Sequence, residues 1–335
     1  MAMSGGVDSS VAAFLMKKAD GECAGCYMIL NEYTDGETDA QKCAEKLELP
    51  FLSADFRKEF KEGVLDYFVK DYLTGCTPNP CVECNKLIKF GRLLDYAKEN
   101  GFDRLATGHY ARIEEKDGRF LLKKAVDLSK DQSYFLYRLS QEQLSRIVLP
   151  LGGYTKEEIR AVAEANSFEN AHKKDSQDIC FVPDGKYVDV IEKEAEELPK
   201  HGEFVDKNGR VLGEHLGIYR YTYGQRKGLG ISADRPLYVT KIDTLNNRVI
   251  LGDNEDLFAK EITVQNVNWI KNPADGSFRA KARLRYCHKE QPATIEVLSD
   301  DSIQIIFDEP QRAATKGQSA VVYDEDYVVC GGIIV

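Results

Sequence analysis

Hydrophobic positions in the first half of the chain follow two patterns, short continuous runs and helical periods. One run, CAGCYMIL, covers residues 23–30, and a shorter run begins at Phe51. Apolar residues recur with helical spacing within residues 11–16, 39–47, 60–73 and 85–100. Short buried strands that alternate with helices are typical of a parallel sheet with helices on its faces. We therefore expect an α/β domain over residues 1–190, with ligands at the carboxyl ends of its strands.

The pattern changes after two further helical segments, residues 155–166 and 185–198. Polar and apolar positions then alternate through residues 203–215 and 237–253, with turn residues at Asn208-Gly209 and Asn246-Asn247. These are signals of β-hairpins. Strand patterns recur from Glu261 onward. We expect a small β-rich central domain over residues 195–253 and a C-terminal β-barrel over residues 258–335.

Composition narrows the class of protein. The chain of 335 residues is too long to fold around a single ordinary hydrophobic core, so two or three domains are expected. Its 43% hydrophobic and 30% charged residues are typical of globular proteins. No apolar run approaches the roughly 20 residues of a membrane span, and the first residues, MAMSGGVDSS, lack the pattern of a secretory leader. We therefore expect a cytoplasmic protein with no membrane partner.

Charge argues against one mode of nucleic-acid binding. The net charge of -10 disfavours unspecific coating of nucleic acid. Two short segments nevertheless combine cations with aromatic residues: YRYTYGQRK, residues 219–227, and KARLRYCHK, residues 281–289. Such segments can stack on unpaired RNA bases, or they can be solvated faces of strands.

The chain contains nine cysteines, an odd number that fits reduced thiols better than a disulfide framework. Cys23, Cys26 and Cys43 lie in apolar or helical contexts, which are typical of small buried hydrophobic residues. Cys23 and Cys26 also form a CxxC pair. Strand alternation sends these two side chains to opposite faces, so the pair is a weak metal signal.

The segment MSGGVDSS, residues 3–10, is the strongest local signal. Its two glycines let backbone amides converge, and the helix that follows offers its positive end to an anion. The segment lacks the lysine of a Walker loop and the spacing of a dinucleotide fingerprint. It resembles the SGGxDS loop of ATP pyrophosphatases, which bind the diphosphate of ATP and adenylate a substrate. The alternative is a plain tight turn.

This resemblance implies ATP and Mg2+ as cofactors. It assigns phosphate binding to Ser4, Gly5, Gly6, Asp8, Ser9 and Ser10, and it includes the neighbouring Ala2, Met3 and Val7 among the residues that bind the nucleotide. Within that set Asp8 would help to hold the magnesium ion, and Met28 and Gly108 match positions that contact adenosine. In that family an apolar strand precedes the loop, so we expect the first strand to be missing here.

Seven later motifs occur in order along the chain: TPNPCVECNKLIKFG, ATGHYAR, KDQSYFLY, KKDSQDICF, YTYGQRKGLGI, RLRYCHK and KGQSAVVYD. Together with the loop they resemble the tRNA-specific 2-thiouridylase family over nearly the whole chain. The resemblance implies that ATP activates the wobble uridine as an adenylate on O2 and that a cysteine persulfide delivers sulfur to C2. The implied partners are a tRNA with a wobble uridine and a sulfur donor, either a cysteine desulfurase or a relay protein.

The resemblance also implies residue roles. Cys84 matches the nucleophile and Cys180 the cysteine that bears the persulfide, and the two can close a disulfide during the cycle. Asn79, Pro80 and Cys81 match the segment that meets the target base. Seven further residues match positions that touch the tRNA: His109, Lys130, Asp131, Gln132, Arg285, Tyr286 and Gln318. Taken singly, His109 reads as a core histidine and Gln318 as a polar residue on a barrel strand, but the ordered motifs favour the functional interpretation.

Cys81 leaves the sulfur route open, because many family members carry Asp at this position. In a persulfide route Cys180 carries the sulfur and Cys84 resolves it, while Cys81 is either a spare thiol or a replacement for a carboxylate that tunes the pKa of its neighbours. In a cluster route Cys81, Cys84 and Cys180 are candidate ligands of an iron–sulfur cluster. A structural zinc would need a fourth ligand, for which Cys76 is the local candidate.

Two other classes of function remain open from the sequence. Another adenylating enzyme of the same loop family, such as an amidotransferase or a lysidine synthase, would use ATP without needing Cys84 or Cys180. An RNA-binding or redox-sensing protein with an inactive nucleotide loop would not turn over ATP.

Overall fold

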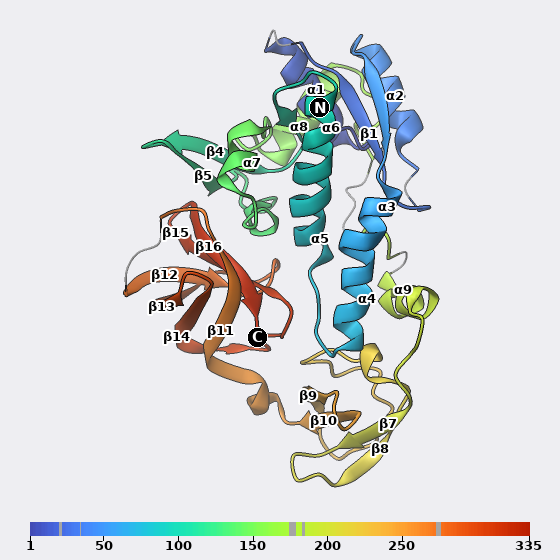
Figure 1. The fold of residues 1–335 in the computed structure, drawn as a ribbon, viewed down its shortest axis with the longest axis vertical. Helices are drawn as coiled ribbons and strands as arrows, with labels where there is room; N and C mark the ends of the chain where they lie inside the picture. The colour runs from blue at the N-terminus through green and yellow to red at the C-terminus, as the bar shows by residue number, and fades with distance from the viewer. Residues whose placement is uncertain (20–21, 34, 174–178, 183–184, 273–275) are drawn as a thin grey trace. The chain divides into compact units, whose positions relative to one another are not determined.

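The computed structural model describes residues 1–19, 22–33, 35–173, 179–182, 185–272 and 276–335 (Figure 1). The chain forms two compact units. The first contains Met1–Val64, Cys81–Gly185 and Asp324–Val329, and the second contains Leu65–Pro80, Lys186–Tyr323 and Cys330–Val335. None of the helices in the described ranges is both long enough and apolar enough to span a membrane.

The first unit contains two pairs of parallel strands. Strand β1 (Gly25–Ile29) pairs with β2 (Phe51–Asp55), and β3 (Leu105–Ala106) pairs with β6 (Ile147–Val148). A hairpin of β4 (Ala111–Lys116) and β5 (Arg119–Lys124) follows β3. This is the parallel arrangement that the alternating pattern predicts.

Residues 1–3 join the two parallel pairs. The backbone N–H of Ala2 donates to Ala106 O at 2.9 Å, and that of Met3 donates to Cys26 O at 2.8 Å. Cys26 in turn donates to Met1 O at 2.8 Å, and Ala2 and Cys26 form a parallel bridge. These three residues therefore occupy the rung between β1 and β3 and lead directly into the glycine loop.

Helices surround these strands. The first unit holds α1 (Val7–Lys18), α2 (Glu37–Lys46), α3 (Arg57–Phe60), α6 (Leu93–Glu99), α7 (Gln141–Arg146) and α8 (Lys156–Ala165), with the 3-10 turn η3 (Ser133–Phe135). The segments predicted as single helices at 60–73 and 85–100 are each interrupted by π-helix, η1 (Lys61–Leu65) and η2 (Cys84–Arg92). A short helix, α5 (Pro80–Glu83), leads into η2.

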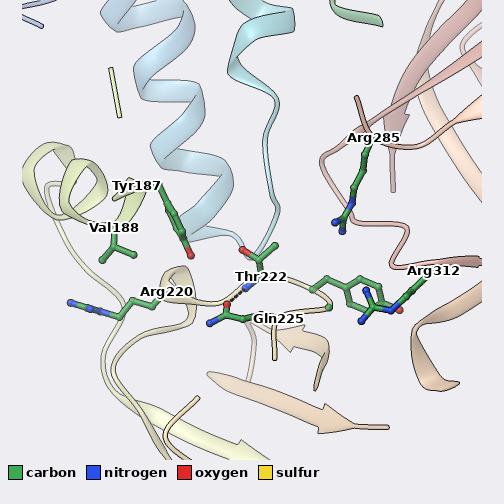
Figure 2. A pocket seen from close by; sticks show the side chains of 9 residues that line it. Tyr187, Val188, Arg220, Thr222, Gln225, Arg285 and Arg312 are labelled. Carbon is green, nitrogen blue, oxygen red and sulfur yellow. Dashed lines mark hydrogen bonds between the residues drawn. The ribbon is translucent and has the colours of Figure 1, made fainter. Parts of the chain in front are cut away.

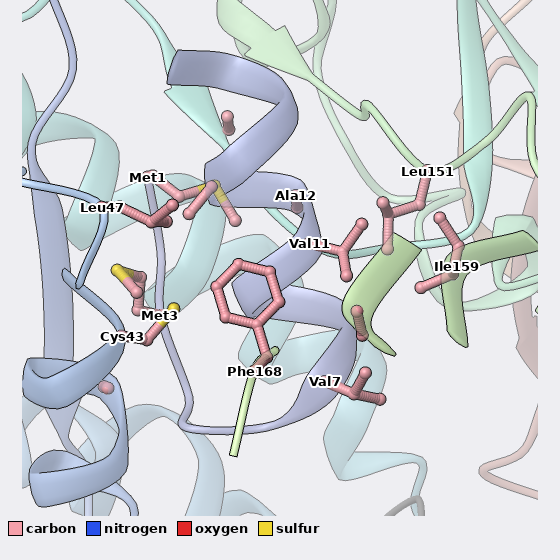
Figure 3. Packing of buried hydrophobic residues seen from close by; sticks show 14 of the residues in the cluster. Met1, Met3, Val7, Val11, Ala12, Cys43, Leu47, Leu151, Ile159 and Phe168 are labelled. Atoms are coloured by element: carbon pink, nitrogen blue, oxygen red, sulfur yellow. The ribbon is translucent and has the colours of Figure 1, made fainter. Parts of the chain in front are cut away.

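Helix α1 lies in the core of the first unit. Its residues Val11, Ala12 and Ala13 are fully buried, and Figure 3 shows Val11 beside Leu151 and Ile159. The small alanines let neighbouring elements approach the helix closely, which a larger side chain would prevent. This core fixes the direction of α1 and so the place of its N-terminus.

The second unit begins with α4 (Asp66–Leu73) and α9 (Tyr187–Glu194). A four-stranded sheet follows in the order β8 (Val211–His215), β7 (Gly202–Val205), β10 (Arg248–Gly252) and β9 (Tyr238–Asp243), with the 3-10 turn η5 (Ile218–Arg220). The two predicted hairpins are β7–β8 and β9–β10. Their buried face contains Phe204, Val239 and Val249, each fully buried.

A closed barrel completes the second unit after the 3-10 turn η6 (Asn254–Leu257). Its strands are β11 (Phe258–Trp269), β12 (Ser277–Arg283), β13 (Gln291–Ser299), β14 (Ser302–Arg312), β15 (Ser319–Asp324) and β16 (Tyr327–Ile334), orange to red in Figure 1. The order is β11-β14-β13-β12-β15-β16, and β16 returns to pair with β11. The predicted fold class is thus confirmed, with an α/β domain, a β-rich central part and a C-terminal barrel.

Candidate nucleotide and thiol site

The glycine loop is braced by its own side chains. Gly5 adopts φ +75, and a Cβ there would lie 2.5 Å from Gly36 O, so no larger residue fits. Ser9 Oγ accepts from Ser4 N at 3.2 Å and donates to Gly6 O at 2.9 Å. The loop ends at Gly6, the N-cap of α1, whose first N–H groups have no partner within the helix. This is the geometry of an anion site.

Close backbone contacts place Gly108 and Gly36 against the loop. A Cβ on Gly36 would lie 2.3 Å from Ser4 O, and one on Gly108 would lie 3.0 Å from Asp8 C. The structure therefore brings Gly108, predicted to contact adenosine, to the loop itself. Met28, the other such residue, lies in β1 opposite Ala54.

Asp8 is held by Lys156, which lies outside the sequence motifs, and by Tyr110 of the motif ATGHYAR. Lys156 Nζ lies 2.7 and 2.8 Å from the two carboxylate oxygens of Asp8, and Tyr110 OH donates to Asp8 Oδ1 at 2.7 Å. Lys156 is only 8% exposed. The capping box of Thr155 and Glu158 places Lys156 in the first turn of α8, but nothing in that local pattern links it to a loop 148 residues away. The loop itself lacks the lysine of a Walker motif, but Lys156 of α8 places an ammonium group beside it.

Asn170 is the third side chain from outside the loop that contacts it. Its Nδ2 donates to Gly5 O at 3.1 Å and to Ser10 Oγ at 2.8 Å. Its Oδ1 is buried and, among the residues that the structure describes, has no hydrogen-bond partner. A buried acceptor of this kind beside an anion site fits a ligand that brings its own donors.

The three predicted thiols share one electrostatic neighbourhood in the first unit. Burial raises the pKa of Cys84 to about 12, while Lys89 lowers it and the charges of Cys180 and Cys81 raise it further. Burial also raises the pKa of Cys81, with Cys180 acting in the same direction. Cys84 is buried at the start of η2, whereas Cys180 is exposed. The thiols are therefore protonated near neutral pH in this arrangement.

Cys180 lies at the carboxyl edge of the sheet. Its Sγ is 4.0 Å from Nδ2 of Asn31, a residue just beyond the end of β1. The next residue, Phe181, is buried and packs edge-on against Phe60 with ring centroids 5.5 Å apart. Because the glycine loop follows an extended segment parallel to β1, Asn31 and the loop leave the sheet at the same edge.

Lys89, which lies within the motif TPNPCVECNKLIKFG, is a second cation to which the sequence analysis assigned no role. It lies five residues after Cys84 in the π-helix, where hydrogen bonds run from residue i to i+5. Burial raises the pKa of Cys81 and Cys84, and the positive charge of Lys89 lowers it. The surrounding protein also raises the pKa of Cys180, although this residue is exposed at the surface, and Lys89 again acts in the opposite direction. A cation placed in this way favours thiolate formation.

A metal does not fit this arrangement of thiols. Within the described ranges, no three His, Cys, Asp or Glu side chains are grouped so that they could hold an ion. Cys81, Cys84 and Cys180 therefore do not form a ready-made iron–sulfur site among the described residues. By contrast, Mg2+ can bind through one or two carboxylates together with phosphates, and Asp8 fits that role.

Several predicted tRNA contacts in the first unit have internal partners. His109 Nδ1 is 2.7 Å from Thr107 Oγ1, and burial, followed by the charge of Lys89, holds the pKa of His109 well below its usual range. Gln132 Oε1 accepts from Tyr110 N at 2.9 Å.

Asp131 is also turned inward. It is buried and accepts from Ala125 N and Ser133 N, each at 3.1 Å. These bonds order the turn that carries Lys130, which is half-buried.

In the second unit, Gln318 braces the segment before Asn79 and Pro80. Its Nε2 donates to Thr77 O at 2.9 Å and to Pro78 O at 3.0 Å. Arg285 and Tyr286 lie just after β12, and Tyr286 is 40% exposed.

Comparison with known proteins decides the family. Residues 1–184 match the tRNA methyl transferase HUP domain, residues 189–253 the tRNA methyl transferase PRC-barrel domain, and residues 259–334 the aminomethyltransferase beta-barrel domain. The tRNA-specific 2-thiouridylase MnmA of Clostridioides difficile is 48% identical, with 99% of this chain and 96% of that protein aligned. The chain belongs to the tRNA-specific 2-thiouridylase family.

Other relatives agree. One tRNA-specific 2-thiouridylase of Clostridium botulinum is 46% identical over 100% of this chain and 97% of its own length. The Clostridium perfringens protein is 45% identical over 99% and 96%. The predicted resemblance to the 2-thiouridylase family is thus confirmed. Residues 174–178 of the motif KKDSQDICF lie outside the described residues, while Cys180 lies within them.

Proposed function

We propose that this thiouridylase adenylates O2 of the wobble uridine in a tRNA and then replaces that oxygen with sulfur carried as a persulfide on Cys180. Membership of the family supports the general activity, which is that of a tRNA sulfurtransferase. The observation that supports the finer route is the grouping of Cys180, Cys84 and Lys89 in the unit that also holds the glycine loop.

Activation would take place at the glycine loop. Uracil O2 attacks the α-phosphorus of ATP, and pyrophosphate leaves toward the backbone amides of residues 4–10 and the N-terminus of α1. Bound Mg2+ would shield the phosphate charge beside Asp8. Lys156 would balance the remaining negative charge, because its ammonium group is already held at the loop.

Sulfur transfer would use the thiols. The Cys84 thiolate attacks Sγ of the Cys180 persulfide, the outer sulfur leaves as hydrosulfide and adds to C2, and AMP departs with the former O2. The two cysteines are left as a disulfide, which an external dithiol must reduce before the next cycle. Exposure of Cys180 fits loading by a sulfur donor, and Lys89 favours the thiolate that Cys84 needs.

The domain roles complete the proposal. Residues 1–190 would form the catalytic domain, 195–253 the central domain and 258–335 the tRNA-binding barrel. The target base would meet Asn79, Pro80 and Cys81, and must leave the anticodon stack to do so. His109, Lys130, Asp131, Gln132 and Gln318 would order the surfaces that meet the tRNA, because most of them brace backbone segments.

The test separates the two half-reactions. Pyrophosphate release that depends on tRNA and 2-thiouridine formation, measured by mass spectrometry of digested tRNA, would be followed in Cys84→Ala and Cys180→Ala. We expect pyrophosphate release to persist while 2-thiouridine falls below detection. Full thiolation by both variants would reject the proposed route, and ATP turnover with another product would instead indicate a different adenylating enzyme.

A further inference from the structure

The π-helix η2, which carries Cys84, has a register that is rare in proteins. The backbone N–H of Leu93, just after η2, donates to Ile88 O, five residues earlier. A Cβ on Gly91 would lie 3.0 Å from Lys86 O, which shows the same spacing of five residues. Such wide turns occur frequently at functional sites, whereas the α-helix is the ordinary form of a helical segment. Contacts from outside the helix must therefore stabilise this register.

The register decides on which side of the helix Lys89 lies. In an α-helix, a residue five positions after Cys84 would be turned away from it by about 140°. In a π-helix, hydrogen bonds join residues five apart, so Lys89 lies closer to the side that carries Cys84. Burial raises the pKa of Cys84, and the charge of Lys89 is the next largest influence and lowers it. A return to α-helix would move this charge away from the thiol.

One side chain of α7 bridges two carbonyl groups of η2. Gln143 Nε2 donates to Lys86 O at 3.1 Å and to Phe90 O at 2.8 Å. Where π-helical hydrogen bonds give way to those of an α-helix, one backbone carbonyl is left without a backbone donor. Phe90 lies in the last turn of η2, directly before α6, where this change takes place. Gln143 therefore supplies a donor at the turn where the wide register lacks one.

Gln143 is itself held in one orientation. Its Oε1 accepts from Ser140 N at 2.9 Å, and its own backbone N–H donates to Ser140 Oγ at 3.1 Å, which is the capping box at the start of α7. Because the amide oxygen is engaged in this cap, the amide nitrogen faces η2. Leu144, the next residue, is fully buried and anchors α7 in the first unit. The donor is therefore in place before any substrate binds.

Two further contacts hold the start of the same helical segment. Asn85 Nδ2 donates to Phe135 O at 3.3 Å. Glu83, which is 9% exposed, is ion-paired with Arg138. Both partners belong to the segment that leads into α7. Residues 135–143 therefore contact the helix of Cys84 at its start and near its end.

We propose that Gln143 is a positioning residue for sulfur transfer, which holds η2 in the π register and so keeps Lys89 on the side of the helix that carries Cys84. This role rests on the proposed function, in which the Cys84 thiolate attacks the Cys180 persulfide. Gln143 acts through Lys89, because a nearby cation favours the thiolate. Loss of its donor should therefore slow the sulfur step and leave adenylation at the glycine loop unchanged.

The test replaces one amide by a carboxylate at two positions of α7. Gln143→Glu keeps an oxygen that can accept from Ser140 N and loses the donor to η2. Gln141→Glu is the matched control, because Gln141 accepts from Phe120 N and donates to Phe120 O, each at 2.9 Å, and so contacts β5 instead. Full chains loaded with persulfide would be mixed with ATP, Mg2+ and unmodified tRNA. Sulfur transfer and pyrophosphate release would then be followed separately in a single turnover.

The two half-reactions should respond differently. We expect Gln143→Glu to slow sulfur transfer about three- to tenfold and to leave the rate of pyrophosphate release unchanged, whereas the control keeps both rates. In a Lys89→Met background the same substitution should cause no further slowing, because both changes remove the same contribution. Hydrogen exchange in peptides that cover residues 84–92 should be faster in Gln143→Glu and unchanged in the control.

Several outcomes would overturn the assignment. An unchanged rate of sulfur transfer in Gln143→Glu, or unchanged hydrogen exchange in η2, would each do so. Equal slowing of both half-reactions would indicate a general structural role, and slowing that persists in full in the Lys89→Met background would show that Gln143 does not act through Lys89.

Two provisions keep the result interpretable. Should the carboxylate prevent folding, the uncharged pair Gln143→Met and Gln141→Met gives the same comparison. If the unsubstituted protein forms no 2-thiouridine, the proposed function fails first, while hydrogen exchange still tests whether Gln143 holds the π register.

Discussion

At the scale of single residues, two lysines to which the sequence motifs assigned no role set the charges of the site. Lys156 neutralises Asp8 at the glycine loop, and Lys89 lowers the pKa of three cysteines. Both belong to helices that a sequence pattern can locate. The links of Lys156 to Asp8 and of Lys89 to Cys180 could not be predicted from sequence, because packing between distant segments makes them.

Replacing Lys156 should lower the stability of the folded protein even in the absence of ATP. We expect Lys156→Met to lower the free energy of unfolding by about 1.5–3 kcal/mol, because Asp8 would keep its charge in a mostly enclosed position without its strongest partner. Lys173→Met is the matched control: Lys173 pairs with Asp39 at 2.9 Å, but both side chains are nearly half exposed, so less than about 1 kcal/mol should be lost. Urea unfolding would measure both. An equal loss in the two variants would contradict the assigned role of Lys156.

Lys89 should control the reactivity of the thiols. A positive charge stabilises thiolate, so Lys89→Met should raise the pKa of Cys180 and slow its alkylation by iodoacetamide several-fold at a fixed pH below that pKa. Lys86→Met serves as the control, because Lys86 lies on the same π-helix but does not contribute to the shifts of the three cysteines. The rate would be followed against pH by mass spectrometry of the peptide that carries Cys180. Identical pH profiles for the two variants would refute this role.

At the scale of elements, hydrophobic periodicity predicted most of the architecture. The hairpins at Asn208-Gly209 and Asn246-Asn247 and the run of barrel strands could be predicted because turn residues and alternation are local. The π-helices η1 and η2 could not be predicted in this way. Their hydrogen bonds span one residue more than those of an α-helix, and tertiary packing rather than the local sequence selects this spacing. The rung formed by Met1–Met3 likewise depends on pairing with residues far along the chain.

The glycine loop offers a test at the same scale. Gly36→Ala would place a Cβ 2.3 Å from Ser4 O, so the two backbones must separate. We expect a loss of about 1–3 kcal/mol in the free energy of unfolding and weaker ATP binding by calorimetry. The control is Gly153→Ala, because a Cβ there meets nothing within 4 Å. ATP affinity equal to that of the control would show that this close approach does not shape the nucleotide site.

At the scale of the whole molecule, the sequence and structure agree on the order of folds along the chain, from the α/β part to the C-terminal barrel. Cys81, Cys84, Cys180 and the glycine loop lie in the first unit, and Arg285 and Arg312 lie in the second. The sequence indicated two separate segments rich in cations and aromatic residues, 219–227 and 281–289, but only the fold shows that residues of both line one hollow (Figure 2). Sequence also could not show that Asp131 and Gln132 turn inward, because side-chain direction in a loop depends on its neighbours.

The persulfide route makes a prediction about metal content. Protein purified without oxygen should contain far less than one iron per chain, and Cys81→Ala should retain most of its thiolation, because Cys81 has no step of its own. Iron and sulfide analysis with an absorption spectrum would check this. Stoichiometric iron and sulfide that disappear in Cys81→Ala together with activity would establish the cluster route instead.

The most direct test of the central claim follows sulfur through one turnover. The protein would be loaded with radioactive persulfide, freed of excess donor, and mixed with ATP, Mg2+ and unmodified tRNA, with Cys287→Ser as a control for the other exposed cysteine among the described residues. We predict that the unsubstituted protein and the control transfer close to one sulfur per chain to the tRNA, whereas Cys180→Ser transfers none. Transfer by Cys180→Ser at the unsubstituted level would contradict the claim that Cys180 carries the sulfur.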